Sequence, residues 1–249
     1  MRIALAQVNP IVGDLAGNRA LVERAAARAA AEGADLVVLP ELVLTGYPPM
    51  DLLERAGFVR DQLGQLDALL PASRDVAIAL GAVIPATREP DGARTGEIGE
   101  LWNAGVLLAR GERVAVRPKS LLPTYDVFDE KRYFAPAARR EVLRLPGDAT
   151  TLGFAICEDT WTEVMEYDLD PVAELQWGGA RIVLSPSASP WHVGKAAERR
   201  AMLSRLARRC GLAIVFVNQV GGNDELVFDG GSFVVDANGD VQAQLPLFE

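Results

Sequence analysis

Short apolar runs alternate along the chain with stretches in which apolar residues recur at helical spacing. This alternation of strand-like and helix-like segments is typical of a layered α/β domain. The pattern predicts strands at 3–8, 36–39, 76–83, 104–109, 113–117, 142–145, 152–156, 182–184, 213–217, 231–235 and 241–245, and helices at 18–32, 58–70, 169–177 and 195–209. No linker, low-complexity tract or internal repeat interrupts the pattern, so we expect one domain over residues 1–249.

Turn and capping residues mark several of the expected boundaries. Asn18 is expected to cap the first helix, and Gly33 suits the position just after the end of that helix. Residues 36–39 (LVVL) are continuously apolar, as in a strand that is buried on both faces. Arg110-Gly111 is expected to join two strands in a hairpin, and residues 86–100 (ATREPDGARTGEIGE) are expected to form a polar loop.

Composition excludes several classes of protein. The 249 residues are 49% hydrophobic and carry a formal net charge of −9, a balance that supports a folded core and excludes disorder as the main state. A pI near 4.8 argues against binding nucleic acid through a basic surface. One histidine (His192) and two cysteines (Cys157 and Cys210) are too few for a zinc site built from these residue types.

The sequence also carries expectations about the location of the protein. Its first residues, MRIALAQVNP, are strand-like and show no signal-peptide pattern. No apolar stretch approaches the roughly 18 residues that cross a bilayer, so no membrane segment is expected. Two cysteines do not form the disulfide framework that is typical of small secreted domains. We therefore expect a cytoplasmic protein.

Reactive side chains directly follow several of the expected strands. Ligand sites in α/β sheets lie beyond the carboxyl ends of strands, so these residues are the first candidates for a site. After the strands 36–39, 113–117, 152–156, 182–184 and 213–217 come, respectively, Pro40-Glu41, Pro118-Lys119, Cys157-Glu158-Asp159, Ser185-Pro186-Ser187-Ala188-Ser189 and Asn218-Gln219. A carboxylate, an amine and a thiol at three such ends together point to an active site.

Each of these residues also has a purely structural interpretation. Cys157 after a buried strand is most often a small core residue. Glu41 would cap the next segment or pair with an arginine, and Lys119 would ordinarily be solvated. Glu158 and Asp159 would be an acidic pair at the start of a helix. However, only three of the 25 basic residues are lysines, and a lysine differs from an arginine in offering a compact charge with a tunable pKa.

The second cysteine and the histidine carry weaker signals. Cys210 ends an arginine-rich helical segment with no polar constellation around it, so we expect it to be a core residue. His192 lies in a Pro-Trp-His loop and has no catalytic partner that the sequence reveals. A hydrogen-bonded or substrate-facing role is therefore expected for His192 rather than catalysis.

Together, Glu41, Lys119 and Cys157 match the needs of acyl transfer to a thiol. The thiolate is the nucleophile, and with an ordinary pKa near ~8.5 the thiol needs a base at neutral pH. A carboxylate in an enclosed apolar site can take that proton. An ammonium group beside the developing oxyanion, together with backbone N–H groups after the nucleophile, stabilises the tetrahedral intermediate. These residues predict an enzyme that cleaves an amide or a nitrile through a thioester.

At these residues the chain closely resembles the nitrilase (carbon–nitrogen hydrolase) superfamily. The three catalytic motifs of that superfamily stand here as LPELVLTGYPPMDLL (39–53), RPKSLLPTYDVFDEKRYF (117–134) and AICEDTW (155–161). The stretches SASPWHVGK (187–195) and VNQVGGNDELVFDGGSFVVD (217–236) are similar to the glutaminase domains of glutamine-dependent NAD synthetases. The resemblance covers the whole chain, and it implies an α/β fold that is a four-layer αββα sandwich of the nitrilase type.

Carried over position by position, the resemblance assigns roles to single residues. It implies that Glu41 is the general base, Lys119 the oxyanion stabiliser and Cys157 the nucleophile. It also implies that Glu130 is a second glutamate that supports the lysine and the cysteine. The residues that it implies for holding the glutamine substrate are Tyr125, Phe128, Glu158, Ser189 and Lys195. Of these, Glu158 is an anion and therefore suits the α-ammonium group of glutamine.

The resemblance also implies what surrounds the reaction. L-glutamine is the expected substrate, and neither a metal nor a cofactor is expected for amide hydrolysis. In the family, an ATP-dependent NAD synthetase domain, which uses ATP and Mg, follows the glutaminase domain and amidates deamido-NAD with the ammonia. Members of the family also assemble into homo-oligomers. No SGGxDS-like ATP-binding loop occurs in this sequence, so the chain is expected to be either one domain of such a protein or a free-standing hydrolase.

Three functions remain open at this point. The first is a glutaminase that supplies ammonia for NAD synthesis, and the second is a stand-alone ω-amidase, nitrilase or carbamoylase that acts on a small amide. The third is a catalytically silent regulatory or interaction module, against which the joint presence of Glu41, Lys119 and Cys157 argues. The glycine-rich segment Val220–Gly231 is expected either to line an interface or to form an ordinary hairpin.

Overall fold

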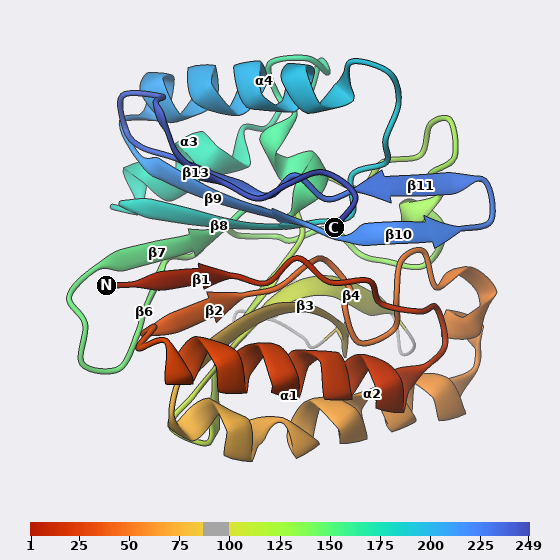
Figure 1. Ribbon diagram of the computed structural model, residues 1–249. Coiled ribbons are helices and arrows are strands. Elements are labelled where there is room, and N and C mark those ends of the chain that lie inside the picture. Colours follow the sequence, from red (N-terminus) through yellow and green to blue (C-terminus); the bar gives the residue numbers. More distant parts are fainter. Residues whose placement is uncertain (87–99) are drawn as a thin grey trace.

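Two β-sheets face each other at the centre of the structure, a computed structural model that describes residues 1–86 and 100–249 (Figure 1). The strands of the first sheet are, in spatial order, β1 (Ile3–Leu5), β2 (Leu36–Val38), β3 (Ala77–Pro85), β4 (Leu101–Ala109) and β5 (Glu112–Pro118). Those of the second sheet are, in spatial order, β13 (Val241–Gln244), β12 (Phe233–Val235), β9 (Ala213–Asn218), β8 (Ile182–Ser187), β7 (Thr151–Phe154) and β6 (Leu143–Arg144). Both sheets are mixed, since β1, β2 and β3 run parallel, as do β7, β8 and β9, while the other pairings are antiparallel.

Helices cover the outer faces of both sheets. Figure 1 shows α1 (Leu15–Ala31) and α2 (Ala56–Ala68) against the first sheet, and α3 (Pro171–Trp177) and α4 (Lys195–Cys210) against the second. The short 3₁₀-helices are η1 (Met50–Glu54), η2 (Leu70–Arg74), η3 (Glu130–Arg132) and η4 (Cys157–Thr160). The chain therefore forms the four-layer αββα sandwich that the family resemblance implied.

Side chains that alternate along the strands divide the core into layers. In β2 and β3, Val37 and Ile78 pack with apolar residues of α1 and α2. Their neighbours Leu36 and Ala79 pack instead with residues of the second sheet such as Phe154. A strand with apolar side chains on both faces reads as a continuous apolar run, which is why residues 36–39 predicted a doubly covered strand.

The first helix begins earlier than the sequence predicted. Asn18 was expected to cap it, but this residue lies buried inside the helix, and its side chain binds the backbone of Ile11 at 2.7 and 2.8 Å and the carbonyl of Leu44 at 3.0 Å. The helix is capped by Asp14, whose carboxylate accepts an N–H of the first turn at 2.9 Å. The prediction for Asn18 was wrong because its side-chain amide connects the loops at Ile11 and Leu44 instead of capping the start of the helix. Gly33 follows the helix end with φ of +72°, as predicted.

The other elements follow the predicted order, with boundaries that shift by a few residues. The turn at Arg110-Gly111 joins β4 to β5 with φ of +57° and +81°. The segment Val220–Gly231 contains the antiparallel hairpin of β10 (Val220–Asn223) and β11 (Leu226–Asp229), which projects beyond the two sheets in Figure 1. Of the polar loop predicted at 86–100, residues 87–99 lie outside the described residues.

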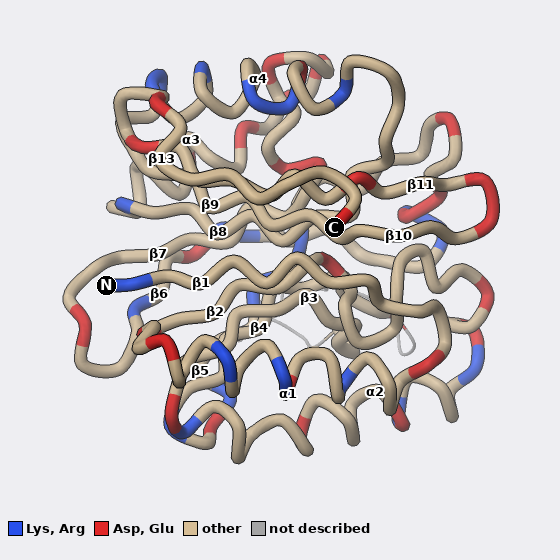
Figure 2. Tube along the Cα trace, in the orientation of Figure 1, with Lys and Arg blue, Asp and Glu red and all other residues tan. Residues whose placement is uncertain are grey.

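Charged residues lie mainly on the outer helices and the loops, whereas most strand positions are uncharged (Figure 2). In the part of the chain that the structure describes, no helix is both long and apolar enough to cross a membrane. Within the described residues, seven charged side chains are nevertheless buried, namely Glu41, Lys119, Glu130, Glu158, Asp159, Arg199 and Asp229. A buried charge is costly unless it has partners, so these residues direct attention to the sites where they meet.

Candidate active site

Three buried charged side chains meet where strands of the first sheet end. Glu41 follows β2, Lys119 follows β5 and Glu130 begins η3. The Nζ atom of Lys119 donates hydrogen bonds to Oε1 of Glu41 at 2.7 Å and to Oε1 of Glu130 at 2.8 Å. An ammonium group carries three N–H donors, so one of them remains for a further acceptor. The interpretation of Lys119 as a solvated residue is wrong, since its side chain is 1% exposed.

Two neutral side chains and one backbone group complete the cluster. Asn103 Nδ2 donates to Oε1 of Glu41 at 2.7 Å and lies 3.5 Å from Oε2 of Glu130. The hydroxyl of Tyr47 donates to Oε1 of Glu130 at 2.8 Å. The N–H of Ala188, which follows β8 of the second sheet, donates to Oε2 of Glu41 at 3.1 Å. The glutamate that is the candidate base is therefore held from both sheets.

Sequence reasoning missed Asn103 and Tyr47. The strand β4 runs antiparallel to its neighbours, so its first residues, not its last, reach the edge where Glu41 lies. The available signal was a single amide near the start of an otherwise apolar strand, LWNAGVLLA. Tyr47 lies in an irregular segment after β2, where neither spacing nor periodicity singles it out.

The charges in this cluster change one another's pKa values. Burial lowers the pKa of Lys119, but the charges of Glu130 and Glu41 outweigh burial and hold it well above its ordinary value. Burial raises the pKa of Glu130 to about 7, although the nearby Lys119 opposes this shift. The lysine is therefore charged throughout the neutral range, whereas Glu130 titrates within that range.

Cys157 begins η4, three residues after the end of β7, in a strained backbone conformation. Its φ of +43° is in the left-handed region, which is unusual for a residue with a Cβ atom and often occurs at functional sites. Burial raises the pKa of the thiol well above its ordinary value, the charge of Glu41 raises it further, and the charge of Lys119 opposes both effects. The resting thiol is therefore protonated at neutral pH, and a nucleophilic role requires a base to remove its proton.

Next to the thiol, two tyrosine hydroxyls bind one buried carboxylate, that of Glu158. The hydroxyl of Tyr125 donates to Glu158 at 2.9 and 3.0 Å to the two oxygens, and the hydroxyl of Tyr167 donates to Oε1 at 2.6 Å. The rings of Tyr125 and Phe128 are in edge contact, with their centroids 5.6 Å apart. Tyr167 was also missed, because it lies in an irregular segment after η4 with no periodic pattern. The arrangement holds an acidic group beside Cys157, where it can meet a cationic part of a substrate.

The second sheet supplies two further candidates, Ser189 and Lys195. Ser189 is buried, and its backbone exchanges two hydrogen bonds with the side chain of Asn218, at 2.8 and 3.2 Å. Lys195 begins α4, and its Nζ atom lies 3.7 Å from the centre of the Trp161 ring and 3.4 Å from Glu198. Burial lowers the pKa of Lys195, while Glu198 opposes the shift. Lys195 thus lies over the turn that follows the nucleophile, and Ser189 lies next to the residue that binds Glu41.

The remaining candidates have structural surroundings. His192 is exposed, its Nδ1 atom lies 3.0 Å from the carbonyl of Val193, and its Nε2 atom lies 3.7 Å from Glu198, which fits the hydrogen-bonded role. Cys210 is partly buried and packs against the apolar core between the second sheet and α4, as expected. Among the described residues, no group of three or more His, Cys, Asp and Glu side chains could hold a metal ion.

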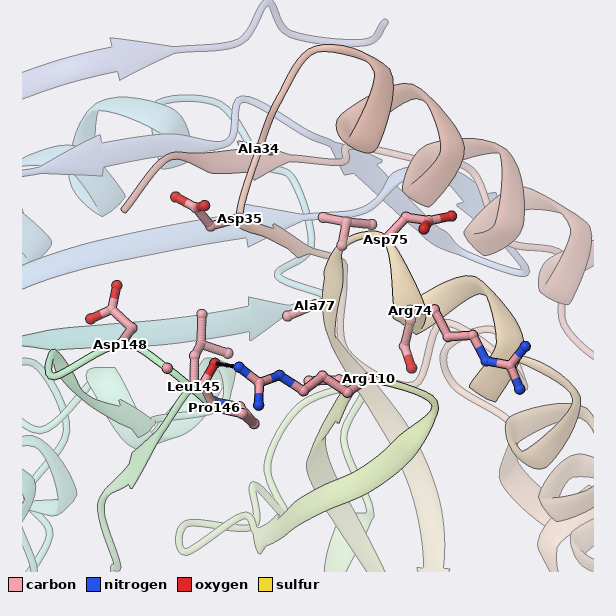
Figure 3. A pocket seen from close by; sticks show the side chains of 13 residues that line it. Ala34, Asp35, Arg74, Asp75, Ala77, Arg110, Leu145, Pro146 and Asp148 are labelled. Carbon is pink, nitrogen blue, oxygen red and sulfur yellow. Dashed lines mark hydrogen bonds between the residues drawn. The ribbon is translucent and has the colours of Figure 1, made fainter.

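A separate cavity of about 270 Å³ lies at the opposite end of the sheets (Figure 3). Its lining includes residues that precede β2 and β3, such as Asp35 and Asp75, and Arg110 after the antiparallel β4. These positions are the amino ends of the parallel strands, whereas Glu41, Lys119 and Cys157 follow carboxyl ends. Arg110 donates to the carbonyl of Pro146 at 2.8 Å across this cavity. None of the candidate catalytic residues lines it.

The whole chain matches one known family. The model of the carbon–nitrogen hydrolase family matches residues 2–249. The chain belongs to the carbon–nitrogen hydrolase family. Membership of this family indicates an enzyme that hydrolyses a carbon–nitrogen bond, which is the class that Glu41, Lys119 and Cys157 predicted. It argues against the interpretation as a catalytically silent module.

Relatives of known name refine the comparison. The chain is 42% identical to a glutamine-dependent NAD(+) synthetase of Synechocystis, in an alignment that covers 99% of this chain and 44% of that protein. A glutamine-dependent NAD+ synthetase from Acinetobacter baumannii, solved in complex with ADP, is 36% identical with a TM-score of 0.86, over 99% of this chain and 43% of that one. An amidase from Nesterenkonia is 28% identical with a TM-score of 0.81, over 100% of this chain and 87% of that one. The chain thus spans less than half the length of the synthetases that it matches.

Proposed function

We propose that the 249 residues act as one glutaminase domain, which releases ammonia from L-glutamine for the amidation of deamido-NAD by a synthetase. The observation that carries the proposal is the buried set of Glu41, Lys119 and Glu130 at one edge with the strained Cys157. Likeness to glutamine-dependent NAD synthetases over at least 99% of the chain supports glutamine as the amide. The proposed catalytic residues are therefore Glu41, Lys119, Cys157 and Glu130.

The first half of the proposed reaction forms a thioester. Glu41 takes the proton of the Cys157 thiol, and the sulfur attacks the side-chain carbonyl carbon of glutamine. The carbonyl electron pair moves onto oxygen, where the remaining donor of Lys119 stabilises the negative charge. The intermediate then collapses, the C–N bond breaks, and the proton held by Glu41 passes to the leaving nitrogen. Ammonia departs and a γ-glutamyl thioester remains on Cys157.

The second half returns the enzyme to its starting state. A water molecule gives a proton to Glu41 and attacks the thioester carbonyl, again with Lys119 stabilising the oxyanion. The C–S bond breaks, the sulfur recovers a proton from Glu41, and glutamate departs. Glu130 accepts a second hydrogen bond from Lys119 Nζ, at 2.8 Å, so the ammonium group keeps one ionic partner while the base changes its charge.

Recognition of the amino-acid end of glutamine is assigned to the surroundings of Glu158. Its carboxylate is fixed by two tyrosine hydroxyls and suits an α-ammonium group. Tyr125 and Phe128 provide an aromatic wall, and Ser189 and Lys195 extend the site from the second sheet. Simple amides and nitriles have no α-ammonium group, so they would not use Glu158.

The setting of the reaction is part of the same proposal. The receiver of the ammonia is an ATP-dependent NAD synthetase domain, which uses ATP and Mg, whereas amide hydrolysis itself uses neither cofactor nor metal. The likeness of this chain to less than half of each synthetase supports a fused partner, and we propose a homo-oligomer. Cys157 and Cys210 are free thiols, which suits a reducing cytoplasm.

A second candidate function is a stand-alone amidase that acts on a small amide. The Nesterenkonia amidase favours it, because this chain covers 87% of that enzyme rather than less than half. The two functions differ in their preference for glutamine. A comparison of kcat/KM for glutamine, for simple ω-amides and for nitriles distinguishes them, with Cys157→Ala as the inactive control.

The decisive experiment for the proposal combines labelling with turnover. A glutamine-mimicking electrophile should modify Cys157, as found by peptide mass spectrometry, and modification mainly at Cys210 would contradict the assignment. Ammonia release from glutamine should then be measured with and without an NAD synthetase and its adenylated substrate. Faster hydrolysis with the partner is expected, whereas high and equal rates would favour the stand-alone amidase.

A further inference from the structure

Asp159 is a buried carboxylate that the proposed reaction does not use. It lies in η4, two residues after Cys157, and its side chain is shielded from solvent. Oδ1 of Asp159 accepts the backbone N–H groups of Ser120 at 3.0 Å and Leu121 at 2.7 Å. Oδ2 accepts the backbone N–H of Ile156 at 2.9 Å. Three backbone donors therefore converge on one side chain.

These three donors belong to the segments that carry the two reactive groups. Ser120 directly follows Lys119 at the end of β5, which is an edge strand of the first sheet. Ile156 directly precedes Cys157 after β7, which belongs to the second sheet. A single carboxylate thus connects the two sheets at the point where the ammonium group and the thiol must act on the same substrate atom. Hydrogen bonds to an ionised acceptor are shorter and stronger than neutral ones.

We propose that Asp159 is a positioning residue that sets the placement of Lys119 Nζ relative to the Cys157 sulfur. It does so by holding the backbone on both sides, without touching the reacting atoms. The inference rests on the roles proposed above for Cys157 and Lys119. Its physical basis is that a displacement of about 1 Å in a reacting group can reduce a rate by roughly 10²-fold.

The carboxylate is suited to this task because it only accepts hydrogen bonds. An asparagine in its place has one acceptor oxygen, and its amide nitrogen would face either Ile156 or the pair Ser120 and Leu121, donor against donor. Burial raises the pKa of Asp159 to about 6, and the backbone donors oppose that shift, so the group is ionised at pH 8. Asp159→Asn is therefore nearly isosteric but breaks one side of the connection.

The test compares Asp159→Asn with Asp170→Asn at pH 8. Asp170 also accepts a backbone N–H, that of Ala173 at 3.0 Å, but at the start of α3 on the outside of the second sheet. Two quantities are measured, namely the rate of alkylation of Cys157 by iodoacetamide and the kcat and KM for glutamine. We expect Asp159→Asn to slow alkylation and to lower kcat by roughly 10²-fold, with little change in KM. Asp170→Asn should retain both rates.

The outcomes separate this inference from the proposed function. Equal alkylation rates and kcat in the two variants would overturn the inference. If the intact enzyme does not hydrolyse glutamine but alkylation still depends on Asp159, the inference stands and the glutaminase proposal fails. If Asp159→Asn does not fold, amide hydrogen exchange on the intact protein tests whether Asp159 connects the two segments. Slow exchange at Ser120 and Leu121, as in a strand, supports the connection, and exchange at the rate of a free loop contradicts it.

Discussion

Among the described residues, Lys119 is the only cation in contact with the buried carboxylates of Glu41 and Glu130. Replacing it with methionine would remove that positive charge. Methionine has a similar length, so Lys119→Met changes the charge far more than the packing. Glu41 would keep its bonds to Asn103 and to one backbone N–H, and Glu130 its bond to Tyr47, but neither would face a positive group. Breaking a buried ion pair by removing one partner costs ~3–5 kcal/mol. We expect a loss of this size in the free energy of unfolding at pH 8.5.

The loss should depend on pH in a defined direction. The folded-state pKa of Glu130 is about 7 against an ordinary value of 4.5, and removing Lys119 raises it further, because the lysine opposes the effect of burial. A folded state with the higher pKa binds more protons than the unfolded chain between these two values, so stability falls as the pH rises through that interval. Lys119→Met should therefore be less destabilising at pH 5.5 than at pH 8.5, because a protonated Glu130 needs no counter-charge.

Activity tests whether the lysine acts through its exact position as well as through its charge. Loss of one oxyanion donor typically reduces a rate by roughly 10²–10³-fold, which is the expected effect of Lys119→Met on ammonia release. Lys119→Arg keeps the charge but places a larger, planar group between the two glutamates, so it should fail nearly as badly. Urea unfolding at both pH values and an ammonia assay measure these effects. Near-full activity in Lys119→Arg, or a Lys119→Met protein as stable as the parent at pH 8.5, would refute the reasoning.

Four further results are expected. Glu158→Gln should raise the KM for glutamine far more than it lowers kcat, since we propose that the side chain meets the amino-acid end, and equal loss for an amide without an α-ammonium group would contradict this role. Gly81→Ala should lower ammonia release, because a Cβ there would lie 2.6 Å from the Cα of Glu41 and displace the base; unchanged kinetics would show that the backbone yields harmlessly. Glu130→Gln should flatten the fall in stability between pH 4.5 and 7, as measured by urea unfolding, and an unaltered slope would assign that fall elsewhere. A chelator should leave ammonia release unchanged, and loss that added metal restores would show a metal requirement.

The strands could be predicted because a strand that is buried on both faces appears in the sequence as a continuous apolar run. The run at 36–39 predicted β2 since both faces of that strand pack against apolar layers. The prediction was weaker where a polar side chain had more than one use. Asn18 is of a residue type that commonly caps helices. Its amide binds the Leu44 carbonyl instead, because the fold brings the Leu44 loop next to it. Contacts between segments distant in sequence are what local spacing does not encode.

The residues of the candidate site likewise fall into those that local sequence predicted and those that depend on contacts between distant segments. Glu41, Lys119 and Cys157 could be found because each directly follows a strand, and the carboxyl ends of parallel strands share an edge. Asn103 could not be found by that search, because an antiparallel strand brings its beginning to the same edge. Tyr167 reaches Glu158 from an irregular segment, where no periodicity fixes the direction of a side chain. Whether Lys119 is buried or solvated follows only from the packing of the two sheets.

The arrangement of charges explains how a buried thiol could become reactive without a large energetic cost. Making a thiolate in isolation would add a negative charge to an apolar site, and the raised pKa of Cys157 reflects that cost. In the proposed reaction, transfer of the proton to Glu41 instead moves the negative charge from one buried atom to another, so the net charge of the site does not change. Lys119 loses an ionised partner at that moment, and its ammonium group is then attracted to the sulfur or to the oxyanion. The ion pair of the resting state is thus exchanged for the one that the reaction needs.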